Sequence, residues 1–274
     1  MSTLNRVDEL ISAVEKTIEN PKKNFNGENI YVGVDLGTAY TVIVVLDKDK
    51  TPIACEMEFA QVIKDGLVVD YIGALNIVKR LKKKIEDKLN IELTKAAIAV
   101  PPGTGKRDTQ THVYVVEGAG MEVVSIVDEP TAANEVLQVN NGVVVDVGGG
   151  TTGLSVFLDG EVVYTADEAT GGTQLSLVVA GGYKISFEEA EERKKKKENK
   201  HEILTMVTPV IQKIATIVKR HINDFNVNEI YLVGGTCCLE GFEKVIEKET
   251  GIKTIKPQNP FLVTPLGIAM NCSK

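Results

Sequence analysis

The chain has 274 residues, of which 43% are hydrophobic and 25% are charged, a composition typical of globular proteins. Its net charge of −7 argues against a general nucleic-acid binder, and it holds no run of about 18 uncharged apolar residues that would indicate a membrane span. Residues 1–20 have no signal-peptide core, and the four cysteines lack metal-binding spacing. We therefore predict a cytoplasmic protein with reduced thiols.

The N-terminal segment carries apolar side chains at helical spacing over residues 4–19, and Asn20-Pro21 and Asn26-Gly27 then break the pattern. This predicts an amphipathic helix and a linker over residues 1–27. In one interpretation the helix packs on the main body of the protein. In the other it docks onto a partner protein or a shell.

The next segment predicts three strands over residues 29–59, with a tight polar turn after the first and a hairpin turn at residues 47–50. A helix from residue 71 and a strand at residues 95–100 follow. The loop PPGTGKRDT behind that strand lacks the G-x-x-x-x-G-K-[ST] spacing of a P-loop, so it predicts no Walker-type site. Residues 108–120 are expected to form a short helix.

Glu129 lies at a predicted junction between a strand and a helix. The segment MEVVSIVDEPTAANEVLQ predicts a strand, a turn at Asp128-Glu129-Pro130 and a helix from Thr131. Proline is favoured at such a helix start. A carboxylate placed there could face a ligand.

Two stretches of the chain repeat one pattern. VGVDLGTAYTVIVVLD and VVVDVGGGTTGLSVFLD each run from an apolar stretch through Asp, Gly and hydroxyl residues to a second apolar stretch. Asp35 corresponds to Asp146 and Gly37 to Gly148, at an offset of 111 residues. An internal repeat at this distance predicts two lobes of similar topology.

The turn of each repeat suits a phosphate. Glycine lets the backbone approach a ligand closely, and successive N–H groups in such a turn form an anion-binding nest. Thr38, Thr151 and Thr152 add hydroxyl donors. An aspartate at the strand end can hold, through water, the cation that accompanies a polyphosphate. The two turns together therefore predict a site for a polyphosphate with Mg²⁺.

The second half predicts a strand near residues 161–167, a glycine pair before a helix, and a highly charged helix over residues 186–200 with Ser186 near its N-cap. A long helix follows over residues 202–222. NEIYLVGGTCCLEGF then predicts a strand, a glycine turn and a helix. The last residues predict a short helix that returns to the first lobe.

Four motifs together resemble a known superfamily. GVDLGTAYT, VDEPTAA, VVDVGGGTTGLSV and IYLVGGTCCLEGF occur in the order of the phosphate-1, connecting, phosphate-2 and adenosine motifs of the actin, sugar-kinase and DnaK-type heat-shock chaperone ATPases. The short length and the segment ISFEEAEERKKK are similar to a family of ethanolamine utilisation proteins within it.

The resemblance implies an α/β protein with the actin-like ATPase fold. It implies two ribonuclease-H-like lobes around a nucleotide cleft, with lobe I over residues 28–142 plus the helix 264–274 and lobe II over residues 143–263. The chaperones have many more residues in the equivalent region. We therefore expect the outer subdomains to be reduced or absent.

The resemblance also implies roles for individual residues. Asp35 and Asp146 would position Mg²⁺ through water, and Glu129 would orient or deprotonate the attacking water. The residues implied at the phosphates are Gly37, Thr38, Ala39, Tyr40, Gly148, Gly149, Gly150, Thr151 and Thr152. Those implied near the phosphates, ribose or base are Gly171, Gly172, Glu191, Lys194, Gly234, Gly235 and Thr236. No lysine can be assigned to catalysis.

Three functions are compatible with this resemblance. The first is an ATP-binding, slowly hydrolysing chaperone or assembly factor for a cobalamin-dependent ethanolamine ammonia-lyase or its bacterial microcompartment. The second is an actin-like filament-forming or scaffold protein, and the third is a small-molecule kinase. The expected ligands are ATP and Mg²⁺. Binding of ATP without turnover remains an alternative to ATPase activity. The expected partner is a protein rather than a nucleic acid or a membrane. Oligomers remain compatible with all three.

Overall fold

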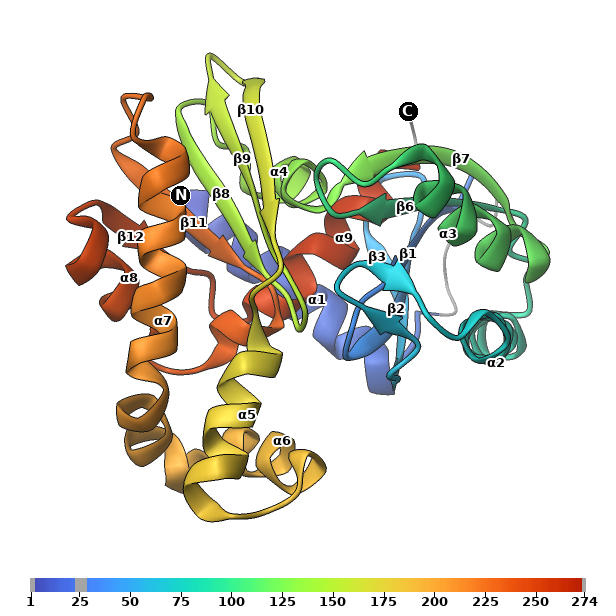
Figure 1. Cartoon of the computed structure of the whole chain (residues 1–274). Helices are drawn as coiled ribbons and strands as arrows, with labels where there is room; N and C mark the ends of the chain where they lie inside the picture. The colour runs from blue at the N-terminus through green and yellow to red at the C-terminus, as the bar shows by residue number, and fades with distance from the viewer. Residues whose placement is uncertain (1–2, 23–28, 273–274) are drawn as a thin grey trace. The chain divides into compact units, whose positions relative to one another are not determined.

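The computed structural model describes residues 3–22 and 29–272. The chain divides into two compact units. Unit 1 consists of Met1–Gln138 and Leu262–Lys274, and unit 2 consists of Val139–Phe261. Each unit is built around its own five-stranded sheet (Figure 1).

The sheet of unit 1 has the strand order β3-β2-β1-β6-β7. The two hairpin-connected pairs are antiparallel, whereas β1, β6 and β7 run parallel. Its strands are β1 (Tyr31–Leu36), β2 (Tyr40–Leu46), β3 (Pro52–Phe59), β6 (Lys95–Val100) and β7 (Glu122–Asp128). A small separate hairpin, β4 (Ile63–Lys64) with β5 (Leu67–Val68), turns at Asp65-Gly66.

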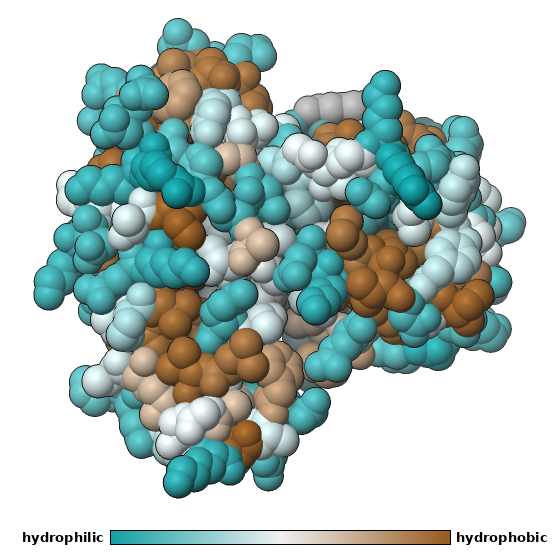
Figure 2. Space-filling model, viewed as in Figure 1, coloured by the Kyte–Doolittle hydropathy of each residue, from teal (hydrophilic) through white to brown (hydrophobic). Residues whose placement is uncertain are grey.

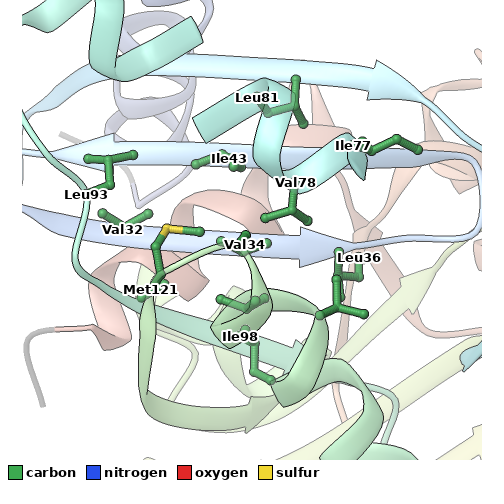
Figure 3. Close-up of a cluster of buried hydrophobic side chains, with 14 of the residues drawn as sticks. Val32, Val34, Leu36, Ile43, Ile77, Val78, Leu81, Leu93, Ile98 and Met121 are labelled. Carbon is green, nitrogen blue, oxygen red and sulfur yellow. The ribbon is translucent and has the colours of Figure 1, made fainter. Parts of the chain in front are cut away.

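Helices cover both faces of this sheet, because its residues alternate between two apolar layers. Ala96 and Ile98 pack on the side of α2 (Tyr71–Leu89) and α3 (Lys106–Gly118), whereas Ala97 and Ala99 pack on the side of α4 (Glu129–Leu137) and α9 (Val263–Asn271). Figure 3 shows the first layer, where Ile77, Val78 and Leu81 of α2 lie over β1 and β2.

The N-terminal helix α1 (Thr3–Glu19) packs on unit 1. Its residues Val7, Ile11 and Val14 are buried, and the Arg6 guanidinium donates a hydrogen bond to the Val136 carbonyl oxygen at 2.7 Å. The interpretation of a helix packed on the body is confirmed. The apolar face of α1 is already covered and is not available to dock a partner.

The sheet of unit 2 repeats the order of the first, as β10-β9-β8-β11-β12. Its strands are β8 (Gly142–Val147), β9 (Thr152–Leu158), β10 (Glu161–Glu168), β11 (Glu229–Val233) and β12 (Lys253–Ile255). The pairs β10-β9 and β9-β8 are antiparallel, and the rest are parallel, as in unit 1. The two sheets therefore have the similar topology that the internal repeat predicts.

The helices of unit 2 pack on one buried cluster that includes Phe242, Ile203 and Val207. The α-helices are α5 (Gly172–Tyr183), α6 (Phe187–Lys195), α7 (Lys200–Ile222) and α8 (Phe242–Thr250). Short 3₁₀ turns are also present: η1 (Lys197–Asn199), η2 (Gly235–Cys238) and η3 (Pro260–Leu262), where the chain passes from unit 2 back to unit 1.

Two predicted boundaries were wrong. The helix after β7 begins at Glu129 rather than Thr131, because Asp128 is its N-cap and accepts the Thr131 N–H at 2.9 Å. The charged helix begins at its Ser186 cap as predicted but ends at Lys195, short of residue 200.

Candidate functional site

The repeated motifs form two hairpins with one geometry. In unit 1, β1 turns into β2 over residues 37–40, and the Gly37 N–H donates to the Tyr40 carbonyl oxygen at 3.0 Å. In unit 2, β8 turns into β9, and the Gly148 N–H donates to the Thr151 carbonyl oxygen at 3.0 Å. The same bond recurs at the offset of the sequence repeat.

The tips of both hairpins present backbone amides. Among the described residues, no acceptor is found for the N–H groups of Thr38, Ala39, Gly149 and Gly150. Adjacent N–H groups without an internal acceptor are the arrangement that binds anions. The geometry of both hairpins is therefore compatible with the phosphate binding that the sequence predicts.

The unit 2 hairpin is supported from behind. The first amides of α5, those of Gly172 and Thr173, donate to the carbonyl oxygens of Gly148 and Gly149 at 3.0 and 2.8 Å. The Thr236 hydroxyl donates to the same Gly148 oxygen at 2.7 Å. Three donors thus hold the outward carbonyls of this turn in place.

Three of the predicted ligand glycines are required by the chain's own packing. A Cβ on Gly171 would lie 2.6 Å from the Gly148 carbonyl oxygen, and one on Gly172 would lie 2.5 Å from the Thr236 hydroxyl. Gly234 has φ +92°, and a Cβ there would lie 2.3 Å from an Asp146 oxygen. These glycines let α5 and η2 approach the hairpin closely.

Gly148 differs from them. A Cβ on Gly148 would lie 3.5 Å from the Thr151 carbonyl oxygen, an ordinary contact. The fold itself therefore leaves room for a side chain at this position. A ligand that approaches the turn would account for a glycine there.

The two aspartates stand at the carboxyl ends of corresponding strands. Asp35 lies near the end of β1 and is half-buried, whereas Asp146 lies near the end of β8 and is 6% exposed. Beside Asp146, burial and then the aspartate charge raise the pKa of Cys237 well above its ordinary value. That thiol stays protonated and is not a nucleophile.

Glu129 shares an edge of the unit 1 sheet with Asp35. Because β1, β6 and β7 run parallel, their carboxyl ends meet at one edge, and Glu129 follows directly on β7. One strand separates the two carboxylates, which places them about 10 Å apart across the sheet. The junction predicted for Glu129 is confirmed.

Glu191 and Lys194 form an ion pair against the start of α5. Their charged atoms are 2.9 Å apart, and the Lys194 ammonium also donates to the Gly172 carbonyl oxygen at 3.2 Å. The Ser176 hydroxyl bonds to Glu191. Burial lowers the pKa of Lys194, and the Glu191 charge opposes that shift. The pair therefore ties α6 to the helix that supports the hairpin.

The hydroxyl groups around these residues differ from the sequence prediction in two ways: one predicted hydroxyl is used inside the fold, and three buried hydroxyls were not predicted. The Thr152 hydroxyl, expected to face a ligand, donates to the Thr170 carbonyl oxygen at 2.7 Å. The buried hydroxyls of Thr41, Thr131 and Thr170 have no protein partner among the described residues. Thr41 and Thr170 adjoin the predicted site residues Tyr40 and Gly171, and Thr131 lies two residues after Glu129. Ordered water would satisfy these hydroxyls. Only the three-dimensional contacts reveal these positions.

The donor set suits a cation held through water. Among residues 3–22 and 29–272, no group of three or more His, Cys, Asp or Glu side chains could hold a metal ion directly. Mg²⁺ usually keeps several waters and binds through one or two carboxylates and the phosphates of its nucleotide. One aspartate beside each hairpin fits that mode.

Similar proteins were found by sequence. A family model described as type IV pilus assembly protein PilM matches residues 110–270. The chain is 42% identical to ethanolamine utilization protein EutJ of Escherichia coli (strain K12) over 241 residues, which cover 88% of this chain and 85% of that protein. A more distant match is chaperone protein dnaK3 of Synechocystis, at 28% identity over 58% of this chain and 22% of that protein.

Solved structures share the fold. The ethanolamine utilization protein EutJ from Carboxydothermus hydrogenoformans gives a TM-score of 0.92 at 47% identity, covering 98% of this chain and 100% of that one. The PilM-PilN type IV pilus biogenesis complex gives 0.75 at 14% identity over 89% and 98%. MreB 5 of Spiroplasma citri bound to AMPPNP gives 0.71 at 16% identity over 89% and 96%. The expected actin-like ATPase fold is confirmed, and the chain has the reduced size expected of it.

The four cysteines, all within the described residues, are free thiols. Within the same residues, no helix has both the length and the apolar composition needed to cross a bilayer.

Proposed function

Because the chain belongs to the family of the ethanolamine utilization protein EutJ, we propose that it binds ATP with Mg²⁺ and acts as a chaperone or assembly factor in ethanolamine utilisation. Its client would be a cobalamin-dependent ethanolamine ammonia-lyase or a component of the bacterial microcompartment. Hydrolysis would be slow, and the bound nucleotide would set the affinity for the client.

The repeated hairpin is the observation that carries this proposal. Two turns, 111 residues apart, close with the same Gly N–H to carbonyl bond and leave adjacent amides at their tips without an internal acceptor. A single turn of this kind is common in proteins. Two matched copies, each next to an aspartate, are explained by a ligand with several phosphates and a cation.

The residues would act mainly by position and charge. The amides of the two tips would bind the phosphates, and Asp35 and Asp146 would hold the hydrated Mg²⁺. Glu129 would orient the water that attacks the γ-phosphate. Mg²⁺ would neutralise the charge on the phosphate oxygens. Glu191 and Lys194 would act near the nucleoside from α6, where they contact the start of α5.

Related structures support the two halves of the proposal. MreB 5 of the same fold is described as bound to AMPPNP, an ATP analogue, and PilM is described in a complex with PilN. A nucleotide and a protein partner are therefore both compatible with this fold.

Calorimetric titration of the purified chain with ATP, with and without Mg²⁺, tests the proposal, and phosphate release is followed in the same sample. We expect binding that requires Mg²⁺ and a slow release of phosphate. Binding of ATP without phosphate release would support a nucleotide-dependent switch and contradict the proposed ATPase activity. No heat at millimolar ATP would overturn the assignment and leave the fold as a scaffold.

A further inference from the structure

A second aspartate of unit 2 lies in line with Asp146. In the antiparallel part of the sheet, Asp146 of β8 pairs with Gly153 of β9, and Gly153 pairs with Asp167 of β10. These three strands lie side by side (Figure 1). Residues directly opposite each other in antiparallel strands carry their side chains on the same face. Asp146 and Asp167 therefore flank Gly153 on one face of the sheet.

Gly153 places no side chain between the two aspartates. Neighbouring strands lie about 4.8 Å apart, so the backbones of Asp146 and Asp167 are about 10 Å apart across β9. Gly153 is buried. A glycine inside a strand weakens it and often marks a place where a ligand comes close. The two carboxylates can therefore face a common ligand over this strand.

Unit 1 has a different row at the corresponding positions of its sheet. There Asp35 pairs with Val42, and Val42 pairs with Met57. Val42 corresponds to Gly153 at the 111-residue offset of the repeat. The shared topology therefore accepts a branched side chain in the middle of the row and an apolar one at its end. The glycine and the second aspartate of unit 2 need another explanation.

The row lies at the end of the sheet that carries the glycine turn. Asp146 and Asp167 are the penultimate residues of β8 and β10, and Gly153 is the second residue of β9. The exposed valines of β10, Val162 and Val163, lie near its other end, where Figure 2 shows hydrophobic residues at the turn between β9 and β10. The carboxylate of β10 is thus at the end next to the amides predicted to bind phosphate.

A buried hydroxyl at the same end indicates ordered water. Thr170, two residues beyond β10, is 3% exposed, and its hydroxyl has no protein partner among the described residues. Thr170 is tied to the start of β9, because its carbonyl oxygen accepts the Thr152 hydroxyl at 2.7 Å. Ordered water normally satisfies a buried hydroxyl of this kind. Mg²⁺ also usually keeps several of its waters when it binds a protein.

Building on the proposed binding of ATP with Mg²⁺, we propose that Asp167 is a second carboxylate that positions the hydrated Mg²⁺ together with Asp146. Mg²⁺ holds a water at about 2.1 Å, and that water reaches a carboxylate oxygen at roughly 2.7 Å, so each carboxylate stands about 4–5 Å from the ion. Two carboxylates on opposite sides of the ion are then about 8–10 Å apart. The spacing of the row matches this distance.

Asp167 should then act differently on the two forms of the nucleotide. Its charge attracts Mg²⁺ and favours ATP that carries the ion, but it repels the phosphates of ATP without the ion. Removal of the charge should weaken the binding of ATP with Mg²⁺ and should not weaken the binding of metal-free ATP. A residue that acts only on the fold would lower both affinities.

Calorimetric titration of the full chain with ATP up to millimolar concentration, in Mg²⁺ and in EDTA, tests Asp167→Asn. We expect the affinity in Mg²⁺ to fall about tenfold, as for other residues that orient the ligands of a metal ion. The affinity in EDTA should be no lower than that of the parent chain. The matched control is Asp159→Asn, which removes the same charge from the exposed turn between β9 and β10 and should change neither affinity.

Asp167→Glu separates charge from shape, because it keeps the carboxylate on a longer side chain. It should lose less affinity in Mg²⁺ than Asp167→Asn does, and an equal loss would contradict a role for the charge. An equal loss with and without Mg²⁺ in Asp167→Asn would mean that Asp167 acts through the fold. Unchanged affinities would mean that this charge only keeps the edge strand β10 from pairing with another strand. Each of these results overturns the proposal.

The same titrations separate this inference from the proposed function. A parent chain that shows no Mg²⁺-dependent ATP binding would overturn both. A parent chain that binds ATP with Mg²⁺, together with an Asp167→Asn variant that binds it equally well, would overturn the role of Asp167 alone. Circular dichroism and urea midpoints of the nucleotide-free chains show that the compared variants are folded.

Discussion

The glycine hairpins of the two units share one turn and differ in what holds it. In unit 1 the turn is held by its own sheet, where the Ala60 N–H donates to the Ala39 carbonyl oxygen and the Tyr40 ring meets Phe59 edge-on at 5.5 Å. In unit 2 the turn accepts hydrogen bonds from α5 and from Thr236.

This difference teaches that a duplicated turn can keep its geometry while its support changes. Helix and 3₁₀ donors fix the unit 2 hairpin, and the aspartate beside it is buried. The unit 1 hairpin depends on an aromatic contact at the sheet edge, and its aspartate is half-buried. Variants in corresponding positions should therefore act more strongly in unit 2.

The largest expected effect is that of Gly234→Ala on stability. Alanine would have to adopt φ +92°, and its Cβ would clash with an Asp146 oxygen at 2.3 Å and with the Val147 carbonyl oxygen at 2.5 Å. We expect a loss of roughly 3 kcal/mol or more in the free energy of unfolding, because backbone and a buried carboxylate must both move. Urea denaturation measures it.

Gly120→Ala in unit 1 is the matched control. Gly120 has φ +84°, but a Cβ there would meet nothing within 4 Å. Only the backbone strain remains, at about 1–2 kcal/mol. Equal losses in the two variants would show that close packing around Asp146 contributes nothing.

The next effect concerns the two aspartates. Asp146→Ala should reduce Mg²⁺-dependent ATP affinity about 100-fold or more, or ~3 kcal/mol, and Asp35→Ala should reduce it less. The reason is that a charge acts more strongly from a buried position than from a half-exposed one. Calorimetry gives both affinities, and circular dichroism confirms that the fold is retained. Unchanged affinity in Asp146→Ala would remove the proposed site.

Gly148→Ala should reduce ATP affinity roughly tenfold, or ~1.4 kcal/mol, with little change in stability. The fold leaves room for the methyl group, which would lie 3.5 Å from its nearest neighbour. A phosphate bound at the turn would collide with that methyl group. Gly171→Ala, where the methyl group would lie 2.6 Å from the Gly148 oxygen, should instead unfold more easily. If Gly148→Ala binds ATP as well as the parent chain, the turn does not contact phosphate.

The sequence predicted the sheets and the turns for clear physical reasons. Short apolar runs rich in valine that end in Asp-x-Gly favour a strand followed by a tight turn, and their repetition predicted equal topologies. The N-cap at Ser186 was also visible, and the Ser186 hydroxyl and the Glu189 carboxylate accept the two hydrogen bonds of a capping box. Local chemistry was sufficient in each case.

Other features depend on contacts that no local pattern encodes. The glycines at 148, 171 and 234 look alike in the sequence, yet two of them serve internal packing and one does not. The charged run beyond Lys195 gave no sign of where α6 ends, because lysine and glutamate favour helix on both sides of that point. Tertiary packing decides such positions.

The smallest effect compares the outer strand ends, where β3 stops at Phe59 and β10 stops at Glu168. The Glu168 carboxylate lies 2.9 Å from the His221 ring nitrogen and also pairs with Arg220. The hydrogen bond to His221, and after it the charge of Arg220, lower the pKa of Glu168 from its usual 4.5, although burial acts in the opposite direction. A carboxylate with a lowered pKa stabilises the fold above its unfolded pKa, and that stabilisation is lost as the pH falls through the folded value. Glu168→Gln should therefore be less stable than the parent chain near pH 7 and equally stable well below 4.5.

Tyr40→Leu in unit 1 should cost about 1 kcal/mol at every pH, because the aromatic pair it removes does not titrate in this range. Urea midpoints of both variants and the parent chain, measured from neutral pH to acid, give the comparison. A pH-independent difference for Glu168→Gln would mean that the carboxylate acts through packing alone. A pH-dependent difference for Tyr40→Leu would mean that a titrating group supports the unit 1 hairpin as well, and the contrast between the two supports would then be one of degree.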